Sequence, residues 1–152
     1  MILSIITVSF NNLDGLTKTT NSIIEQTFRD FEWIVIDGGS SDGSKEYLIK
    51  NSKYISYWCS EPDNGIYNAM NKGIMKAKGN YLLFMNSGDF LFNKHVLKKV
   101  FSSRHEKKLL CGGECLYSVK NSQTHIVWYN AISAEPRRCR QKDCPVSVFC
   151  SS

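Results

Sequence analysis

The sequence has no long hydrophobic run. No segment approaches the roughly 20 apolar residues that a transmembrane helix needs. The apolar start, MILSIITVSF, lacks a basic leading region and continues directly into Asn11 and Asn12, so it fits a first buried strand better than a signal peptide. These absences predict a cytoplasmic globular protein.

Phosphate-binding glycine loops and metal-binding pairs are also missing. G-x-G-x-x-G does not follow the first apolar run and G-x4-G-K-[ST] occurs nowhere, so dinucleotide and P-loop classes lose their main support. The histidines are dispersed, and no cysteine pair has the C-x2-C spacing. Free thiols are therefore favoured over zinc, although Cys111 with Cys115 and Cys139 with Cys144 leave a zinc site open.

The net charge of +5 is modest. The lysines are scattered rather than interleaved with aromatics, so nucleic-acid binding is not expected. The same charge suits a protein at the inner face of an anionic membrane and equally a protein far from one. Peripheral membrane association is therefore an open alternative.

Apolar runs and amphipathic stretches alternate through the first 89 residues. The runs cover 2–10, 31–36, 54–59 and 81–85, and the stretches begin near Asp14, near Asp42 or Ser44, and at Ile66. Asp14 is expected to cap the first helix and Gly79 to end the third. This alternation predicts an α/β fold, with a mostly parallel sheet flanked by helices.

The pattern weakens after residue 89. Residues 94–101 suit a helix, and 109–119 and 124–129 suit two strands joined by a polar turn at 121–122. From residue 131 the composition becomes basic and contains both Cys and Pro. We expect a domain over residues 1–130 and a divergent tail over 131–152.

Carboxylates follow two of the predicted strands. Asp37 comes directly after WIVI, and Asn86-Ser87-Gly88-Asp89 follows YLLFM. Parallel sheets commonly bind ligands where strands end, and a carboxylate near a core needs a partner. Asp37 is therefore expected to reach a base or ribose, and Asp89 to bind metal with help from the Asn86 amide. For Asp89, a simple turn carries equal weight.

Three further segments are polar. Asp42 is expected to serve the start of a helix rather than a ligand, and Asp63-Asn64-Gly65 to form a turn before the helix at Ile66. Lys72 suits either a phosphate contact or a solvated position. Together with the strand ends, these segments suggest an enzyme of nucleoside-diphosphate sugars, in which a divalent cation would stabilise the leaving diphosphate.

The motifs SIITVSFNN, SIIEQTFRDFEWIVIDGGSSDGS and SEPDNGIYNAMNKGIMKAKGNYLLFMNSGD occur in this order. On these motifs the chain, from residue 1 to about 129, resembles family 2 glycosyltransferases of the Rossmann-like GT-A fold, especially bacterial members that build exopolysaccharides, capsules or O-antigens. The resemblance implies inverting transfer from a nucleoside-diphosphate sugar to a glycan or lipid-linked acceptor. UDP is the first choice of nucleotide, and GDP and dTDP donors occur among relatives.

The resemblance also implies roles for matching positions. Asp89, with Asn86, would hold Mg²⁺ or Mn²⁺ in place of the family's D-x-D motif. Asp37 would recognise uracil or ribose, and the loop 63–65 would close over the base. The full nucleotide-sugar set is Val8, Ser9, Asp37, Gly38, Asp63, Asn64, Gly65, Lys72, Ser87 and Gly88.

Two departures from the family limit these expectations. Gly38 stands where the family often has a second aspartate, which leaves the nucleobase open. Glu114, Glu135 and Asp143 do not match the pattern around the general base, so no catalytic base is identified. The chain thus looks like a donor-binding half, truncated or frame-shifted at the DNA level. Its alternatives are a nucleotide-sugar-binding module that needs a partner and, last, a nucleotidyltransferase.

Overall fold

The computed structural model describes residues 1–102, 115–120 and 123–128. Its centre is a six-stranded sheet in the order β3-β2-β1-β4-β5-β6. The strands are β1 (Leu3–Ser9), β2 (Phe31–Asp37), β3 (Tyr57–Ser60), β4 (Tyr81–Phe84), β5 (Cys115–Lys120) and β6 (Gln123–Trp128). The pairs β1–β2, β1–β4 and β2–β3 are parallel, whereas β4–β5 and β5–β6 are antiparallel. The predicted α/β fold with a mostly parallel sheet is confirmed.

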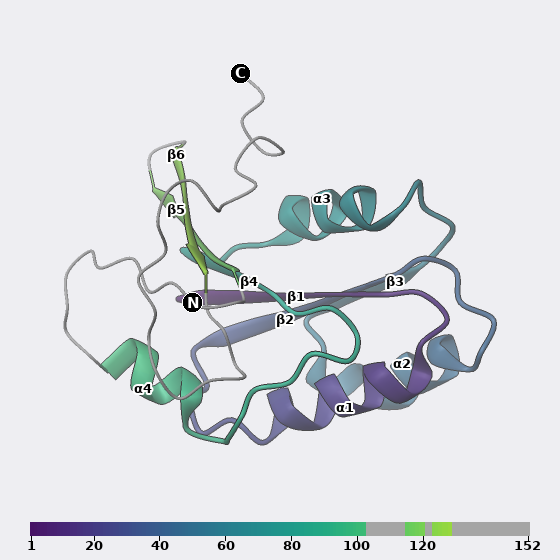
Figure 1. Ribbon diagram of the computed structural model, residues 1–152, viewed down its shortest axis with the longest axis horizontal. Helices are drawn as coiled ribbons and strands as arrows, with labels where there is room; N and C mark the ends of the chain where they lie inside the picture. Colours follow the sequence, from purple (N-terminus) through teal and green to yellow (C-terminus); the bar gives the residue numbers. More distant parts are fainter. Residues whose placement is uncertain (103–114, 121–122, 129–152) are drawn as a thin grey trace.

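Helices cover both faces of the sheet. They are α1 (Leu13–Ile24), α2 (Ser44–Asn51), α3 (Ile66–Lys76) and α4 (Val96–Ser102). Helix α3 lies over one face, and α1, α2 and α4 lie under the other (Figure 1). This arrangement follows from the continuous apolar runs, because a strand buried on both faces needs cover on each.

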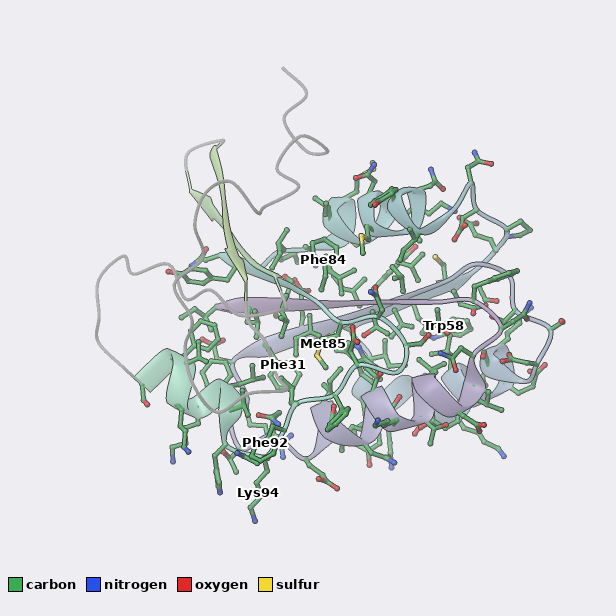
Figure 2. The ribbon with its side chains drawn as sticks, in the orientation of Figure 1. Phe31, Trp58, Phe84, Met85, Phe92 and Lys94 are labelled. Atoms are coloured by element: carbon green, nitrogen blue, oxygen red, sulfur yellow. The ribbon has the colours of Figure 1, made fainter. Side chains whose placement is uncertain are left out.

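Alternate residues of β1, β2, β3 and β4 supply two separate cores. Leu3 and Ile5 of β1 belong to the core between the sheet and α1, while Ile6 and Val8 belong to the core between the sheet and α3. Figure 2 shows the same alternation at the end of β4, where Phe84 and Met85 lie on opposite sides of the sheet. The two-residue period of a strand produces this division.

Gly73 brings α3 close to the sheet. It is buried, and a Cβ atom at this position would collide with Cγ2 of Ile6 on β1. The spacing of small and apolar residues in the predicted helix therefore reflects a close contact between helix and sheet.

Two predicted helix signals are wrong. The cap of α1 is Asn12, whose Oδ1 accepts a hydrogen bond from Gly15 N at 3.0 Å, and Asp14 lies in the first turn instead. Helix α3 ends at Lys76, before Gly79. Gly79 donates its N–H to Ser4 Oγ at 2.8 Å, and a Cβ there would lie 2.6 Å from the backbone of β1, so its role is close approach.

Several element boundaries differ from the expected ones. β3 begins at Tyr57, because Ser52–Tyr54 form a 3₁₀ helix. The two predicted later strands are present as β5 and β6, while 109–114 and the predicted turn at 121–122 lie outside the described residues. So do the tail from 131, Glu114, Glu135 and Asp143, so the division at residue 130 stays a prediction. Within the described part of the chain, no helix is long and apolar enough to cross a membrane.

Candidate functional site

The carboxyl end of β1 lies between the two loops that carry the predicted acidic residues. Gly38 N donates to Ser9 O at 2.9 Å, and Ser87 N donates to Val8 O at 2.9 Å. The loop after β2 and the loop after β4 therefore flank one strand end, as parallel pairing requires. The structure thus brings the expected segments to one edge of the sheet.

Asp37 is fully buried and has several protein donors. Its carboxylate accepts hydrogen bonds from Ser40 N at 2.9 Å, from Ser60 Oγ at 2.7 Å and from Ser40 Oγ. These donors supply the compensation that a buried charge needs. Because two serines already serve as partners, the burial of Asp37 does not by itself require a ligand, and its contact with a base or ribose stays a prediction.

Ser9, unlike Asp37, lacks a protein partner for its buried side chain in the described part of the chain. It is 6% exposed, and its Oγ has no hydrogen-bond partner among the described residues. Ser9 pairs in register with Asp37, so this orphan hydroxyl sits at the strand end between the two polar loops. A buried polar group without a partner costs about 1–3 kcal/mol, which a bound polar ligand would recover.

The loop after β2 is tied to the loop after β1. Asn11 N donates to Ser40 Oγ at 2.7 Å, and Asn11 Oδ1 accepts from Ser41 N at 2.9 Å. Asn11 has φ of 46°, a left-handed conformation that Asn tolerates better than most residues. The two loops thus form one connected wall of the site.

Asp42 supports the start of two helices. It accepts from Ser44 Oγ at 2.6 Å and Ser44 N at 3.1 Å, and from Leu13 N at 2.7 Å. The Ser44 hydroxyl, together with the two N–H groups, holds the pKa of Asp42 below its usual value. The cap residue of α2 is Gly43, so the prediction that Asp42 caps this helix is wrong, although its carboxylate does accept from the first residue of α2.

The loop at residues 86–89 closes on itself. Asp89 Oδ2 accepts from Asn86 N at 2.8 Å, and Asp89 N donates to Asn86 O at 2.9 Å. The turn that the sequence left as the alternative is thus present. The turn uses only one oxygen of the half-buried Asp89 carboxylate. Within the described residues, the other oxygen, Oδ1, accepts no hydrogen bond.

Two side chains of the α1 region hold this loop, and sequence reasoning missed both. Asn12 Nδ2 donates to Ser87 O at 3.0 Å, and Thr19 Oγ1 lies 2.7 Å from Asp89 O. A signal for Thr19 existed, since it shares the buried face of α1 with Leu16 and Ile23. A buried polar residue on such a face has to find a hydrogen-bond partner.

The segment before α3 forms the predicted turn. Asp63 Oδ1 accepts from Gly65 N at 2.8 Å, and Gly65, with φ of 98°, precedes the helix. Asp63 Oδ2 lies 3.0 Å from where a Cβ of Gly38 would be, so the structure brings these two candidates together. Asn64 is exposed beside them.

Lys72 forms an ion pair with Glu61. Its Nζ lies 2.7 Å from Glu61 Oε1. This hydrogen bond raises the pKa of Lys72 and lowers the pKa of Glu61. Cys59 nearby is a free thiol, as predicted, and burial raises its pKa.

The donor set suits an ion shared with a ligand. In the described part of the chain no three His, Cys, Asp or Glu side chains cluster to hold a metal. Mg²⁺ is commonly held by one or two protein carboxylates together with substrate phosphates. Oδ1 of Asp89, which accepts no hydrogen bond from the described residues, fits that arrangement. Asn86, in the same loop, is exposed.

Two curated relatives are glycosyltransferases. An uncharacterized glycosyltransferase of Mycobacterium tuberculosis is 51% identical over 87 residues, which cover 57% of this chain and 33% of the relative. A PGL/p-HBAD biosynthesis glycosyltransferase of Mycobacterium bovis is 29% identical over 151 residues, covering 96% of this chain and 57% of the relative. The chain therefore spans between a third and somewhat over half of the length of these relatives.

Solved structures share the fold. S. aureus TarS 1–349 in complex with UDP-GlcNAc superposes with a TM-score of 0.61 at 22% identity, over 72% of this chain and 38% of that one. The mannosyltransferase PcManGT from Pyrobaculum calidifontis, in complex with GDP-Man and Mn²⁺, gives a TM-score of 0.60 at 16% identity, over 72% of this chain and 33% of that one.

The family model described as glycosyl transferase family 2 matches residues 4–151. That match spans the sheet, the loops at the end of β1 and every candidate residue above. The chain belongs to glycosyl transferase family 2.

Proposed function

We propose that the edge of the sheet at the end of β1 binds the nucleoside-diphosphate sugar of a glycosyl transfer reaction. The observation that carries the proposal is the buried, unpartnered Oγ of Ser9 at that edge. Val8, Ser9, Asp37 and Gly38 face the nucleoside in this proposal. The donor is UDP-linked, in keeping with the UDP-GlcNAc bound by TarS.

The remaining candidates surround the diphosphate and the base. The loop 63–65 lies over the base, while Ser87, Gly88 and Lys72 lie toward the diphosphate. Lys72 keeps Glu61 as its partner, so its contribution is a neutralised pair rather than a free cation. Changing Lys72 alone should therefore affect donor affinity less than changing Asp89.

Mg²⁺ or Mn²⁺ belongs at Asp89, with Asn86 assisting, in this proposal. When bound, the ion would neutralise the charge that develops on the leaving diphosphate. Asp89 would orient the ion through the carboxylate oxygen that Asn86 N leaves free. Support comes from the donor set and from the Mn²⁺ present with GDP-Man in PcManGT.

The proposed reaction is an inverting transfer to a glycan or lipid-linked acceptor in bacterial surface polysaccharide assembly, in the cytoplasm. The PGL/p-HBAD biosynthesis glycosyltransferase of Mycobacterium bovis, which matches 96% of this chain, supports a role in a biosynthetic assembly pathway. A lipid-linked acceptor would bring the protein to the inner face of the membrane, where a net charge of +5 is favourable.

A second candidate is a donor-binding module that needs a partner for turnover. One observation favours it: the carboxylate that ends β2 and those in the loops after β2, β3 and β4 each already accept a hydrogen bond from the protein. Asp37 accepts from Ser40 and Ser60, Asp42 from Ser44 and Leu13, Glu61 from Lys72, Asp63 from Gly65, and Asp89 from Asn86. Each of these five carboxylates therefore has a structural contact, and none of them is assigned as the general base that inverting transfer requires.

Calorimetric titration with UDP, GDP and dTDP, with and without Mn²⁺, tests the binding proposal. Preferential binding of UDP that strengthens with Mn²⁺ supports it, whereas no binding of any of the three would refute it. Donor hydrolysis or transfer then separates the two candidates. Tight UDP binding without turnover would identify the chain as a module.

A further inference from the structure

Thr19 of α1 is buried beneath the loop that carries Asp89. Its side chain is fully buried, and its hydroxyl reaches the backbone of Asn86, Gly88 and Asp89. We propose that Thr19 is a positioning residue, which fixes loop 86–89 so that the Asp89 carboxylate meets the metal and nucleotide. This inference rests on the proposed function.

The hydroxyl both donates and accepts a hydrogen bond. A threonine hydroxyl offers one donor and two acceptor lone pairs. It accepts from Gly88 N at 3.0 Å, and its own proton has Asp89 O at 2.7 Å as the shortest partner. Gly15 O at 3.1 Å and Asn86 O at 3.3 Å are longer alternatives. The bond thus runs from α1 to the loop rather than only within the helix.

The other contacts from β1 and from the start of α1 reach the loop at Ser87, which donates to Val8 O and accepts from Asn12 Nδ2. Thr19 is the residue of α1 that reaches Gly88 and Asp89, and Gly88 has φ of 108°, a conformation that glycine adopts without strain. Asp89 Oδ2 is committed to Asn86 N, so the carboxylate moves with the backbone of these two residues. Both residues are within reach of the Thr19 hydroxyl, and its loss would therefore release the acidic side chain.

The contacts between α1 and this segment recur at a regular interval. Asn12 holds Ser87 O, Thr19 holds loop 86–89, and Gln26 Nε2 donates to Asn93 O at 2.9 Å. Asn12 caps the start of α1, Gln26 follows its end, and Thr19 lies between them at an interval of seven residues, about two helical turns, from each. Figure 1 shows the segment after β4 running beside α1 before α4 begins. Thr19 is the member of this row that touches Asp89.

Thr19→Val keeps the shape and burial of the side chain but removes the hydroxyl. Thr20→Val is a matched control, because Thr20 is equally buried on α1 but donates to Leu16 O of its own helix at 2.7 Å. Thr19→Ser restores the hydroxyl. Each variant is titrated with UDP in the presence and absence of Mn²⁺, and amide hydrogen exchange of residues 86–89 is measured in the absence of both.

We expect Thr19→Val to weaken the Mn²⁺-dependent part of UDP affinity by about 10-fold or more, as is typical when a group supporting a metal ligand is lost. UDP affinity without Mn²⁺ should stay near that of the wild type, and exchange of the Gly88 amide should accelerate. Thr19→Ser should recover both properties, and Thr20→Val should alter neither.

Three results would overturn the inference, and they are distinguishable. Wild-type Mn²⁺ dependence and unchanged Gly88 exchange in Thr19→Val would refute the role of Thr19 alone. Absence of UDP binding or of Mn²⁺ dependence in the wild-type chain would refute the proposed function and the inference with it. Equal losses in Thr19→Val and Thr20→Val would also refute it, since they would indicate general helix damage.

Discussion

Ser9 and Asp37 pair in register on neighbouring parallel strands, yet only Asp37 has its hydrogen-bonding groups satisfied. Asp37 therefore has a structural role in the loop after β2, whereas the hydroxyl of Ser9 remains available to hydrogen-bond a ligand. Asp37 organises the loop after β2 through Ser40 and Ser60. Ser9 carries a buried hydroxyl without a protein partner in the described residues.

Ser9→Ala should reduce UDP affinity without destabilising the fold. Removing an unpaired buried hydroxyl is neutral or stabilising by up to about 1 kcal/mol, because its desolvation penalty disappears. Ser4→Ala is the matched control on the same strand, since Ser4 Oγ donates to Glu32 at 2.6 Å and accepts from Gly79 N. It should cost about 1–3 kcal/mol. Urea unfolding and UDP titration measure the two effects, and a large stability loss in Ser9→Ala would contradict this view.

Asp37→Asn should destabilise the protein. An amide has one acceptor oxygen, so its NH₂ group would oppose the donors from Ser40 or Ser60 in a buried site. The expected loss in the free energy of unfolding is about 2–4 kcal/mol. Asp30→Asn provides the comparison, because Asp30 is exposed and pairs only loosely with the amino terminus at 3.5 Å. Equal stability of the two variants would show that the donors around Asp37 matter little.

Gly73→Ala should destabilise the protein although alanine favours helices. In an exposed helix this change stabilises by about 0.8–1 kcal/mol. Here the new methyl group would meet Ile6 of β1, and such overpacking typically costs about 1–3 kcal/mol. Asn71→Ala, at an exposed position of the same helix, should be neutral or slightly stabilising. Thermal or urea unfolding compares them, and a stabilised Gly73→Ala variant would indicate that α3 packs less closely.

Cys59 should react slowly with alkylating reagents near pH 8. Burial is the main cause of its raised pKa, so the reactive thiolate is scarcer at this pH than in a free cysteine. Its alkylation rate should rise only at higher pH. Glu61→Gln should shift the rise in alkylation rate slightly toward lower pH, because the Glu61 charge also raises the pKa of Cys59. Peptide-resolved mass spectrometry across pH 7–10 follows this site, and a profile like that of free cysteine would be inconsistent with its burial.

The parallel sheet and its polar edge could be predicted from sequence. Each apolar run is followed by Asn, Ser or Asp, and parallel pairing brings such ends to one edge whatever the detailed packing. The cap of α1 could not, because Asn12 and Asp14 are both polar residues near the helix start. Only the backbone conformation selects Asn12.

Contacts between residues distant in sequence escaped prediction. Gly79 looked like a helix terminator, but its role depends on the backbone of β1, more than 70 residues earlier. The same applies to Thr19, which supports a loop 67–70 residues later. The serines that satisfy Asp37 were likewise hidden, because one of them, Ser60, comes from β3.

The most direct test of the proposed donor site is the effect of Mn²⁺ on UDP affinity in the wild-type, Asp89→Ala and Asp89→Asn chains. Asp89→Asn retains an oxygen that can accept from Asn86 N, so it removes charge with the least change to the loop. We expect Mn²⁺ to strengthen UDP binding to the wild type, and both variants to lose that increment while retaining metal-free binding. Unchanged Mn²⁺ dependence in both variants would contradict the assignment of Asp89 and the site built around it.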